Sequence, residues 1–467
     1  MSTITSGNTL LSAITFTGDT TGNLVYIAPN THIFQAGVSN TLSISANSSV
    51  FTGNVTAGNV IASNVTVSGT ITGNVIGNIT GNVTGNIIGT TTLTNPTITG
   101  NTGSISSINT FGFKNRIING AMVIDQRASG ASSTPSSSGT SYDSCDRWMS
   151  LHDVGSKYSI QQVSDAPAGF NYSLKLTSLS AYTLGTNEVF GVKQNIEGFN
   201  VADLGFGTAN AKTVTISFWV KSSLTGTFGG SLQNNDYTRG YPFGYTISSA
   251  NTWTQVSVTI PGDTSGGWLI NNGIGFMVSF SIGSGPGRSN TANVWTGTQY
   301  TFAPTGAVSV VGTSSATWQI TGVQLEVGTQ ATSFDYRDYG RELFMCQRYF
   351  CSSFQDGVAP YNYVSGSEVT QGYYTGMVIV GSADIRTSAI FFPASMRTSP
   401  SITFYKTTNS STNGLWAYFN GSGWATASTT VTDGLGNKGF NADMSISGGS
   451  TGNAFIVSGM WAAAAEL

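Results

Sequence analysis

The stretch "KTVTISFWVKSS" at residues 212–223 decides the fold class of the central part of the chain. Its apolar residues Val214, Ile216, Phe218 and Val220 occupy every second position, so in an extended chain they share one face. β-Branched and aromatic side chains also favour strands over helices. The stretch therefore predicts a strand that is buried on one side.

Further strands of this kind lie on the C-terminal side of this stretch. In "TWTQVSVTIPG" (residues 252–262), Trp253, Val256 and Val258 favour a second half-buried strand, with one break in parity. "ATWQITGVQLEVG" (residues 316–328) predicts a late strand that ends at Gly328. Turns rich in Gly, Ser and Asn separate these segments. Short alternating strands with such turns are typical of a β-sandwich or jelly roll, which we expect over residues 112–338.

One short helix is expected after this domain. In "DYGRELFMCQRYF" (residues 338–350), Leu343, Cys346, Gln347 and Phe350 follow one another at helical spacing. Short strand patterns then return in "TGMVIVGS", "PSITFYKT" and "GNAFIVSGMWAAAAEL". Residues 339–467 are therefore predicted to form a C-terminal domain, a small β-sandwich that follows the helix.

The N-terminal part of the chain has a different pattern, shown by "TGNVIGNITGNVTGNIIG" at residues 72–89. In an extended chain, Gly and aliphatic residues face one side and Asn the other, and the frequent Gly disfavours a helix. The period excludes a coiled coil, and Gly is not at every third position as in collagen. One such ribbon buries little, so we predict an intertwined trimeric β fibre shaft over residues 51–111. The alternative is a flexible polar linker, against which stand four aliphatic residues on one face: Val75, Ile79, Val83 and Ile87.

Composition excludes several classes of function. Charged residues make up 8% of the chain, against about 25% in typical soluble proteins, and the net charge is -3. The sequence shows no basic field that would bind nucleic acid and no apolar run long enough to span a membrane, so we expect neither partner; we also expect no secretion through a signal peptide. The chain has three cysteines (Cys145, Cys346 and Cys351) and two histidines (His32 and His152), which do not have the spacing of a zinc site. We expect reduced structural thiols, no metal and no cofactor.

Several motifs resemble a known family. They are "KNRIINGAMVIDQRASG", "SYDSCDRWM", "TVTISFWVKS", "TWTQVSVTIPGDTSGGW", "ITGVQLEVGTQATSFDYRDYGRELFMCQRYF" and "FFPASMRTSPSIT". In their order they are similar to the distal half of tail fibres of tailed bacteriophages, including phages of cyanobacteria. The resemblance covers roughly residues 114–467. The N-terminal third is similar only in style.

The resemblance implies a homotrimeric fibre in the virion, assembled in the host cytoplasm. Residues 1–50 would be the virion-attachment region and would contact other tail or baseplate proteins. The central region is similar to the jelly rolls of carbohydrate-binding modules. The C-terminal domain would be of a receptor-binding type that faces the host, although such folds also serve as trimer spacers.

The acidic residues give little support for catalysis. Cleavage of a glycan needs two carboxylates about 5–10 Å apart, one of them with a raised pKa. Asp143 and Asp146 flank Cys145, and Asp335 and Asp338 lie in "SFDYRDYG", each pair beside an arginine. Structural ion pairs explain these acids better than catalysis does, and no nucleophile elbow, metalloprotease motif or phosphate-binding loop is present. We therefore expect no enzyme activity.

Sugar binding requires exposed aromatic rings beside amide, hydroxyl or carboxylate groups. Two stretches, "NNDYTRGYPFGY" and "GLWAYFNGSGWATAS", have this mixture. The candidate carbohydrate-binding residues are Tyr237, Arg239 and Tyr241 in the first and Trp416, Tyr418, Asn420 and Trp424 in the second. The alternative for each aromatic ring is a place in the core or in the trimer seam. The sequence thus predicts a trimeric tail fibre that adheres to host surface polysaccharide such as lipopolysaccharide; the alternatives are a purely structural fibre or adaptor and a glycan depolymerase.

Overall fold

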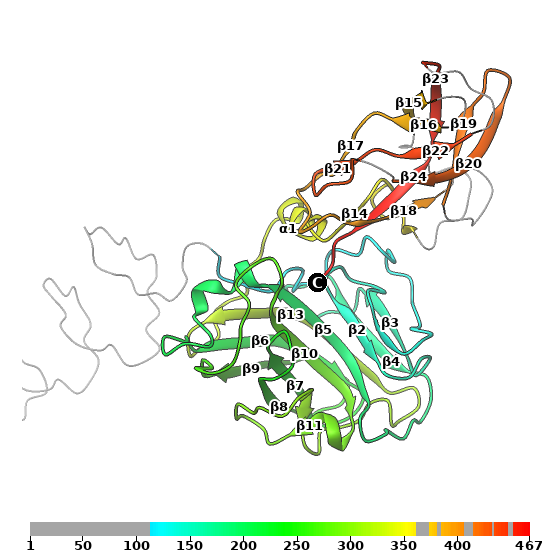
Figure 1. Ribbon diagram of the computed structural model, residues 1–467. Helices are drawn as coiled ribbons and strands as arrows, with labels where there is room; N and C mark the ends of the chain where they lie inside the picture. Colours follow the sequence, from blue (N-terminus) through cyan, green and yellow to red (C-terminus); the bar gives the residue numbers. More distant parts are fainter. Residues whose placement is uncertain (1–112, 361–372, 381–383, 406–413, 432–433, 447–451) are drawn as a thin grey trace, which may run out of the picture. The chain divides into compact units, whose positions relative to one another are not determined.

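The computed structural model describes residues 113–360, 373–380, 384–405, 414–431, 434–446 and 452–467 (Figure 1). The chain divides into two compact units, Met1–Ile98 and Thr99–Leu467, and the described residues all belong to the second. The predicted attachment region (1–50) and fibre shaft (51–111) lie outside the described residues. No helix in the described part of the chain is long and apolar enough to cross a membrane.

Two antiparallel sheets form a jelly roll, as predicted for the central region (Figure 1). The six-stranded sheet contains, in spatial order, β1 (Gly139–Ser141), β2 (Met149–His152), β5 (Val189–Glu197), β10 (Ile274–Ser284), β7 (Gly226–Gln233) and β8 (Gly240–Ile247). The five-stranded sheet contains β3 (Tyr158–Val163), β4 (Ser173–Ser178), β13 (Thr317–Val327), β6 (Val214–Ser222) and β9 (Thr254–Ile260). Three 3-10 turns and a short parallel ribbon lie in the loops: η1 (Gly198–Asn200), η2 (Ala202–Leu204), η3 (Pro286–Arg288), β11 (Ser289–Asn290) and β12 (Ala303–Pro304).

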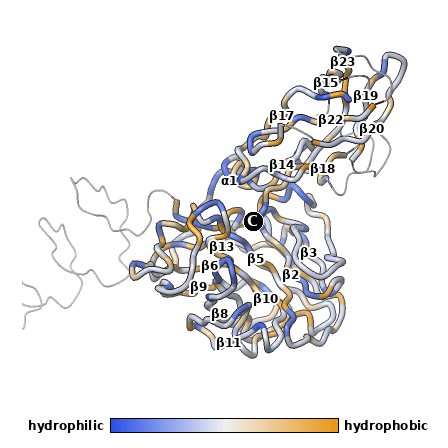
Figure 2. Tube along the Cα trace, viewed as in Figure 1, coloured by the Kyte–Doolittle hydropathy of each residue, from blue (hydrophilic) through white to orange (hydrophobic). Residues whose placement is uncertain are grey.

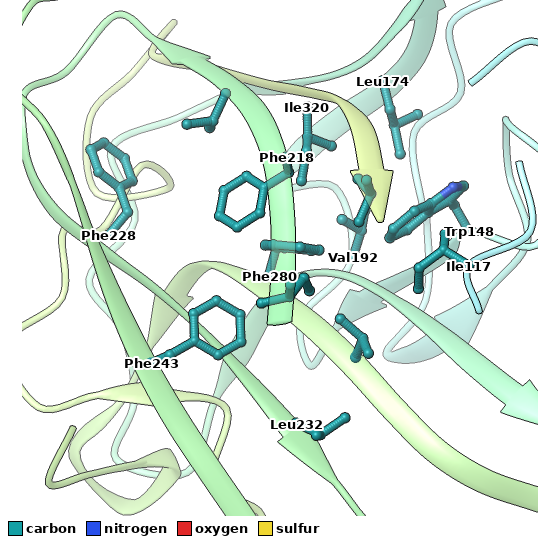
Figure 3. Close-up of a cluster of buried hydrophobic side chains, with 14 of the residues drawn as sticks. Ile117, Trp148, Leu174, Val192, Phe218, Phe228, Leu232, Phe243, Phe280 and Ile320 are labelled. Atoms are coloured by element: carbon teal, nitrogen blue, oxygen red, sulfur yellow. The ribbon is translucent and has the colours of Figure 1, made fainter. Parts of the chain in front are cut away.

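The core of the jelly roll lies between its two sheets (Figure 3). Val214, Ile216, Phe218 and Val220, the residues that predicted strand β6, are all buried there. The ring of Phe218 meets that of Phe280 from the other sheet edge-on, with centroids 4.9 Å apart. Hydrophilic and hydrophobic residues are interleaved along the strands, as the alternation in the sequence predicts (Figure 2).

The predicted helix is α1 (Tyr339–Gln347). Asp338 is its N-cap: the carboxylate accepts a hydrogen bond from the backbone N–H of Arg341 at 2.9 Å. Such a cap satisfies one of the unpaired N–H groups at a helix start. The acidic residue in "SFDYRDYG" nearest the helix is thus explained by local structure.

The C-terminal strands are antiparallel, and six of them close into a barrel, a more closed arrangement than a sandwich. Around the barrel they are β15 (Tyr373–Val380), β16 (Asp384–Thr387), β22 (Asp443–Ser445), β20 (Trp424–Thr430), β19 (Leu415–Phe419) and β23 (Ala454–Ser458). A three-stranded sheet contains β14 (Phe350–Ser352), β24 (Met460–Ala464) and β18 (Ser401–Tyr405), and a ribbon contains β17 (Ile390–Phe391) and β21 (Gly439–Phe440).

Hydrogen bonds and ion pairs connect the jelly roll to the residues that follow it. Arg348 donates to both carboxylate oxygens of Glu197, at 2.6 and 2.9 Å, and the Tyr349 hydroxyl donates to the same carboxylate at 2.6 Å. Glu466 forms ion pairs with Arg127 and Arg147. The arginines of the "DRW" and "CQRY" motifs therefore hold these two parts of the unit together.

Candidate functional site

Two aromatic residues predicted to bind sugar lie instead in the core of the barrel. Trp416 is fully buried, its ring stacks on Tyr374 at a centroid distance of 5.1 Å, and its Nε1 donates to the carbonyl of Met460 at 3.0 Å. Tyr418 is also buried and packs edge-on against Phe455. The two residues share one face of β19, as predicted, but this face points into the barrel. Neither ring is available to stack on a sugar, so the structure does not support them as site residues.

The other two candidates in this stretch lie at the turn between β19 and β20. Asn420 has a structural role there, because its Oδ1 accepts hydrogen bonds from the backbone N–H groups of Ser422 (3.0 Å) and Gly423 (2.9 Å). Trp424 is 49% exposed and its ring packs against that of Phe419, with centroids 5.7 Å apart. Phe419 was not among the predicted residues. Of the four, Trp424 alone keeps a large exposed ring face.

Two candidates near residue 240, Tyr237 and Arg239, are half-buried and bonded to other side chains of the jelly roll. The guanidinium of Arg239 pairs with both carboxylate oxygens of Asp263, at 2.6 and 2.8 Å. Tyr237 packs on Tyr300 with centroids 4.9 Å apart, and its hydroxyl accepts a hydrogen bond from Lys193 Nζ at 3.0 Å. These groups have protein partners, so they are not a free sugar-reading surface.

The third candidate, Tyr241, is buried against Trp295, with ring centroids 5.2 Å apart. It belongs to β8 and points into the core between the sheets. The sequence shows the aromatic residues of this stretch but not that a strand carries Tyr241 into the interior. Tyr241 is therefore a packing residue rather than a surface one.

The outer face of the six-stranded sheet is covered by the chain itself. All nine residues of β5 are buried, as are the central residues of β10. The loop with β12 lies directly on this face: a Cβ added to Gly229 would fall 2.3 Å from Cδ of Pro304. Glycine is needed there because any side chain would push the loop away. Strand β5 and the central part of β10 are therefore covered rather than open to a ligand.

A cleft on another part of the jelly roll does combine exposed aromatic rings with polar groups. We call it the Tyr336 cleft. It has a volume of about 240 Å³ and is lined by Asn115, Gly120, Ala121, Val123, Gly169, Phe170, Asn171, Phe334, Asp335, Tyr336, Arg337, Tyr339 and Glu342. Its walls thus come from three segments of the chain that are far apart in sequence, the last of them leading into α1.

Aromatic packing fixes the shape of this cleft. Phe170, Phe334 and Tyr336 contact one another, with ring centroids 4.8 to 5.4 Å apart. The Tyr336 hydroxyl donates to the carbonyl of Gly169 at 2.8 Å, which holds the ring in place while 59% of the residue stays exposed. Tyr339 is 56% exposed. The cleft therefore presents two large tyrosine surfaces, of which that of Tyr336 is held by a hydrogen bond and by aromatic packing.

The charged groups of the cleft differ in exposure and in how many hydrogen bonds they form with the protein. The side chain of Arg337 is only 5% exposed, and its terminal nitrogens donate to the carbonyl of Ile117 (3.0 Å), to the carbonyl of Asn115 and to the carboxylate of Glu342 (3.3 Å). Asp335 is partly exposed, and Nη2 of Arg337 lies 3.7 Å from its Oδ2. The guanidinium of Arg337 is thus bonded within the protein, whereas the carboxylate of Asp335 remains partly exposed at the surface.

The other acidic pair of the sequence, Asp143 and Asp146, is hydrogen-bonded within the protein. Asp143 accepts hydrogen bonds from the hydroxyls of Ser141 and Ser150. Asp146 is buried and accepts from the backbone N–H of Gln126 at 3.0 Å; burial raises its pKa to about 7. Arg147 pairs with Glu466 rather than with either of these acids. Within the described residues, no group of three or more His, Cys, Asp or Glu side chains could hold a metal ion.

No protein-family model and no curated protein matches the chain. Several solved structures are similar to part of it. The enzymatically active domain of tailspike protein 4 from bacteriophage CBA120 is 12% identical with a TM-score of 0.24, over 46% of this chain and 21% of that one. The CBM22-1 xylan-binding domain from Paenibacillus barcinonensis Xyn10C is 12% identical with a TM-score of 0.21, over 44% and 99% of the two chains. A putative sugar-binding protein from Bacteroides thetaiotaomicron is 10% identical with a TM-score of 0.26, over 46% and 100%.

These values limit what the similarities establish. The chain spans about a fifth of the length of the tailspike domain. At such TM-scores the similarities carry no conclusion about activity or ligand, and the jelly roll is assigned from its own two sheets.

Proposed function

We propose that the protein is a glycan-binding tail fibre of a tailed bacteriophage, which adheres to host surface polysaccharide as a homotrimer and without catalysis. The order of motifs in residues 114–467 supports the fibre assignment. The Tyr336 cleft carries the assignment of glycan binding, because it joins exposed tyrosine rings to a carboxylate and an amide at one surface.

The chemistry of the cleft suits a sugar. A pyranose ring has an apolar C–H face, which packs on an aromatic ring, and hydroxyl groups at its edge that require polar partners. Tyr336 supplies the ring face, while Asp335 and Asn171 supply acceptors and a donor at the same cleft. A cleft of about 240 Å³ is small, so we assign to it one unit of a polysaccharide rather than a long stretch.

Weak binding at one such site is sufficient for a fibre. In a homotrimer each fibre carries three identical clefts, and several fibres on one virion raise the effective concentration of the sites. In this proposal residues 1–50 attach to other tail or baseplate proteins. The protein then acts in the virion after assembly in the host cytoplasm.

The exposed pair formed by Phe419 and Trp424 is a second surface where an aromatic ring could meet glycan. It is less favoured than the Tyr336 cleft because Asn420, the amide in the turn between these two residues, is bonded within that turn. We therefore base the proposed function on the cleft.

The test replaces Tyr336 and Tyr339 by Ala together in the full-length protein. Binding to polysaccharide from the surface of host cells, measured by biolayer interferometry, should weaken about tenfold, equivalent to about 1.4 kcal/mol. Phe199→Ala is the matched control, since Phe199 is an exposed aromatic residue outside the cleft. Unchanged binding would contradict the site, complete lack of binding by the unmodified protein would favour a purely structural fibre, and shortening of the polysaccharide would favour a depolymerase.

A further inference from the structure

The Tyr336 cleft contains charged side chains whose effect on ligand choice the proposed function does not specify. Of the residues that line it, two are acidic, Asp335 and Glu342, and one is basic, Arg337. The positions of these three groups determine which sugars the cleft accepts.

Arg337 cannot serve an incoming anion. Its side chain is 5% exposed, and its terminal nitrogens already donate to the carbonyls of Asn115 and Ile117 and to Glu342. To bind a ligand carboxylate it would have to leave buried acceptors unsatisfied, which is costly. The positive charge therefore fixes the protein backbone and Glu342 rather than a ligand.

Asp335 is the charged group of the cleft that a ligand can reach. Its side chain is 30% exposed, its closest cationic contact is Arg337 at 3.7 Å, and its Oδ2 receives one long hydrogen bond of 3.4 Å from the backbone N–H of Asn115. A carboxylate accepts up to about four hydrogen bonds, so most of its capacity is open to sugar hydroxyl or ammonium donors. A ligand carboxylate placed beside Asp335 would be repelled by its like charge.

From this arrangement we infer that the Tyr336 cleft selects uncharged or amino-substituted sugars and rejects uronic acids and other anionic sugars. The inference rests on the proposed function and adds the ligand class. In the bound state the C–H face of the ring packs on Tyr336, and a hydroxyl or ammonium group of the sugar donates to Asp335. An acidic sugar would place its carboxylate beside that of Asp335.

The experiment uses the full-length protein and three methyl glycosides, those of glucose, glucosamine and glucuronic acid. Binding is measured by saturation-transfer NMR at low ionic strength, with Tyr336→Ala to show which signal comes from the cleft. In bulk water, two unit charges 4 Å apart interact by about 1 kcal/mol, which corresponds to about a fivefold change in affinity. We expect the glucoside and the glucosaminide to bind at least about fivefold more tightly than the glucuronide.

A charge variant tests the cause. Asp335→Asn keeps the shape of the side chain, so glucoside binding should stay within about threefold, glucosaminide binding should weaken and glucuronide binding should strengthen about fivefold. Asp338→Asn is the matched control: it removes the same charge from the N-cap, where Asn is equally favourable, and Asp338 does not line the cleft.

The outcomes separate this inference from the proposed function. Glucuronide binding equal to or tighter than glucoside binding, if lost in Tyr336→Ala, overturns the charge preference but leaves a glycan site. An Asp335→Asn variant with an unchanged order of sugars also overturns it. Binding of none of the three sugars, together with no binding of host polysaccharide, refutes the proposed function itself.

Discussion

Arg147 and Glu466 form an ion pair although they are 319 positions apart in the sequence. Arg147 is buried, lies over the ring of Tyr349 at 3.6 Å from its centroid, and donates through Nη2 to the carbonyl of Asn195 at 2.6 Å. Glu466 also accepts from Nη2 of Arg127 at 2.6 Å. One carboxylate therefore forms ion pairs with two arginines between the jelly roll and the C-terminal strands.

We expect Glu466→Gln to destabilise the protein strongly. The substitution keeps the size of the side chain but leaves two nearly buried guanidinium groups without their counter-charge. Breaking a buried pair by removing one partner typically costs about 3–5 kcal/mol. Urea unfolding followed by tryptophan fluorescence at neutral pH measures the loss.

The control for this prediction is Asp203→Asn. Asp203 also pairs with a buried arginine, Arg116, through both carboxylate oxygens at 2.8 and 2.9 Å, but its own side chain is 50% exposed. Water screens such a pair, so the expected loss is about 1 kcal/mol or less. Equal losses in the two variants would show that burial of Glu466 has no special effect.

Much of the fold could be predicted from the sequence because strand alternation and helix spacing are local signals. Strand β6 (Val214–Ser222) and helix α1 (Tyr339–Gln347) lie where the pattern predicts them. The same signal does not show whether a face points into a closed barrel or outward. Trp416 and Tyr418 share a face, as predicted, but its burial depends on strands β15 and β23, which come from other parts of the chain.

The Tyr336 cleft was missed for a related reason. The charges of the segment "SFDYRDYG" predict structural ion pairs, and the pairing of Arg337 with Glu342 agrees with a structural role. The aromatic residues of this segment are the feature of the sequence that indicates a binding surface here. Phe170, however, lies more than 160 positions earlier, and Gly169, whose carbonyl anchors the Tyr336 hydroxyl, is 167 positions from Tyr336. No local pattern predicts that contact.

The two tryptophans of the β19–β20 hairpin should respond differently to truncation. Trp416→Ala removes a fully buried ring and should cost about 3–5 kcal/mol of unfolding free energy, because the cavity cannot fill. Trp424→Ala removes a half-exposed ring and should cost about 1 kcal/mol or less. Thermal unfolding by calorimetry distinguishes them. Similar losses for both would place Trp424 in a packing role equivalent to that of Trp416.

Gly459 should tolerate no side chain. A Cβ at this position would fall 2.1 Å from ring atoms of Trp416, closer than any real contact. Because Trp416 is held by its stack on Tyr374 and its hydrogen bond to Met460, it cannot move away freely. We expect Gly459→Ala to cost at least about 1–3 kcal/mol, as overpacked cores do.

The matched control is Gly423→Ala at the exposed turn. A Cβ there would meet nothing within 4 Å. Its unfolding free energy should therefore stay within about 0.5 kcal/mol of that of the unmodified protein. Chemical unfolding of both variants decides the matter, and a tolerated Gly459→Ala would show that the Trp416 ring has room to shift.

Asp146 should make stability depend on pH. Burial raises the pKa of this carboxyl from its ordinary value near 3.8 to about 7, so the folded protein binds the proton more tightly than the unfolded chain does. The contribution of Asp146 to stability is therefore fully present below pH 3.8 and is lost as the pH rises toward 7, at up to about 1.4 kcal/mol per pH unit. Above pH 7 both states are ionised and its contribution is level.

Asp146→Asn isolates this effect, because asparagine does not titrate. His152 acts in the opposite sense, since burial lowers its pKa and its contribution to stability grows as the pH rises toward its ordinary value. That dependence is present in both proteins and cancels in their difference. We expect the unfolding free energy of the unmodified protein minus that of the variant to fall steadily between pH 5 and 7 in urea titrations. Parallel pH profiles would mean that Asp146 is ionised throughout this range in the folded protein.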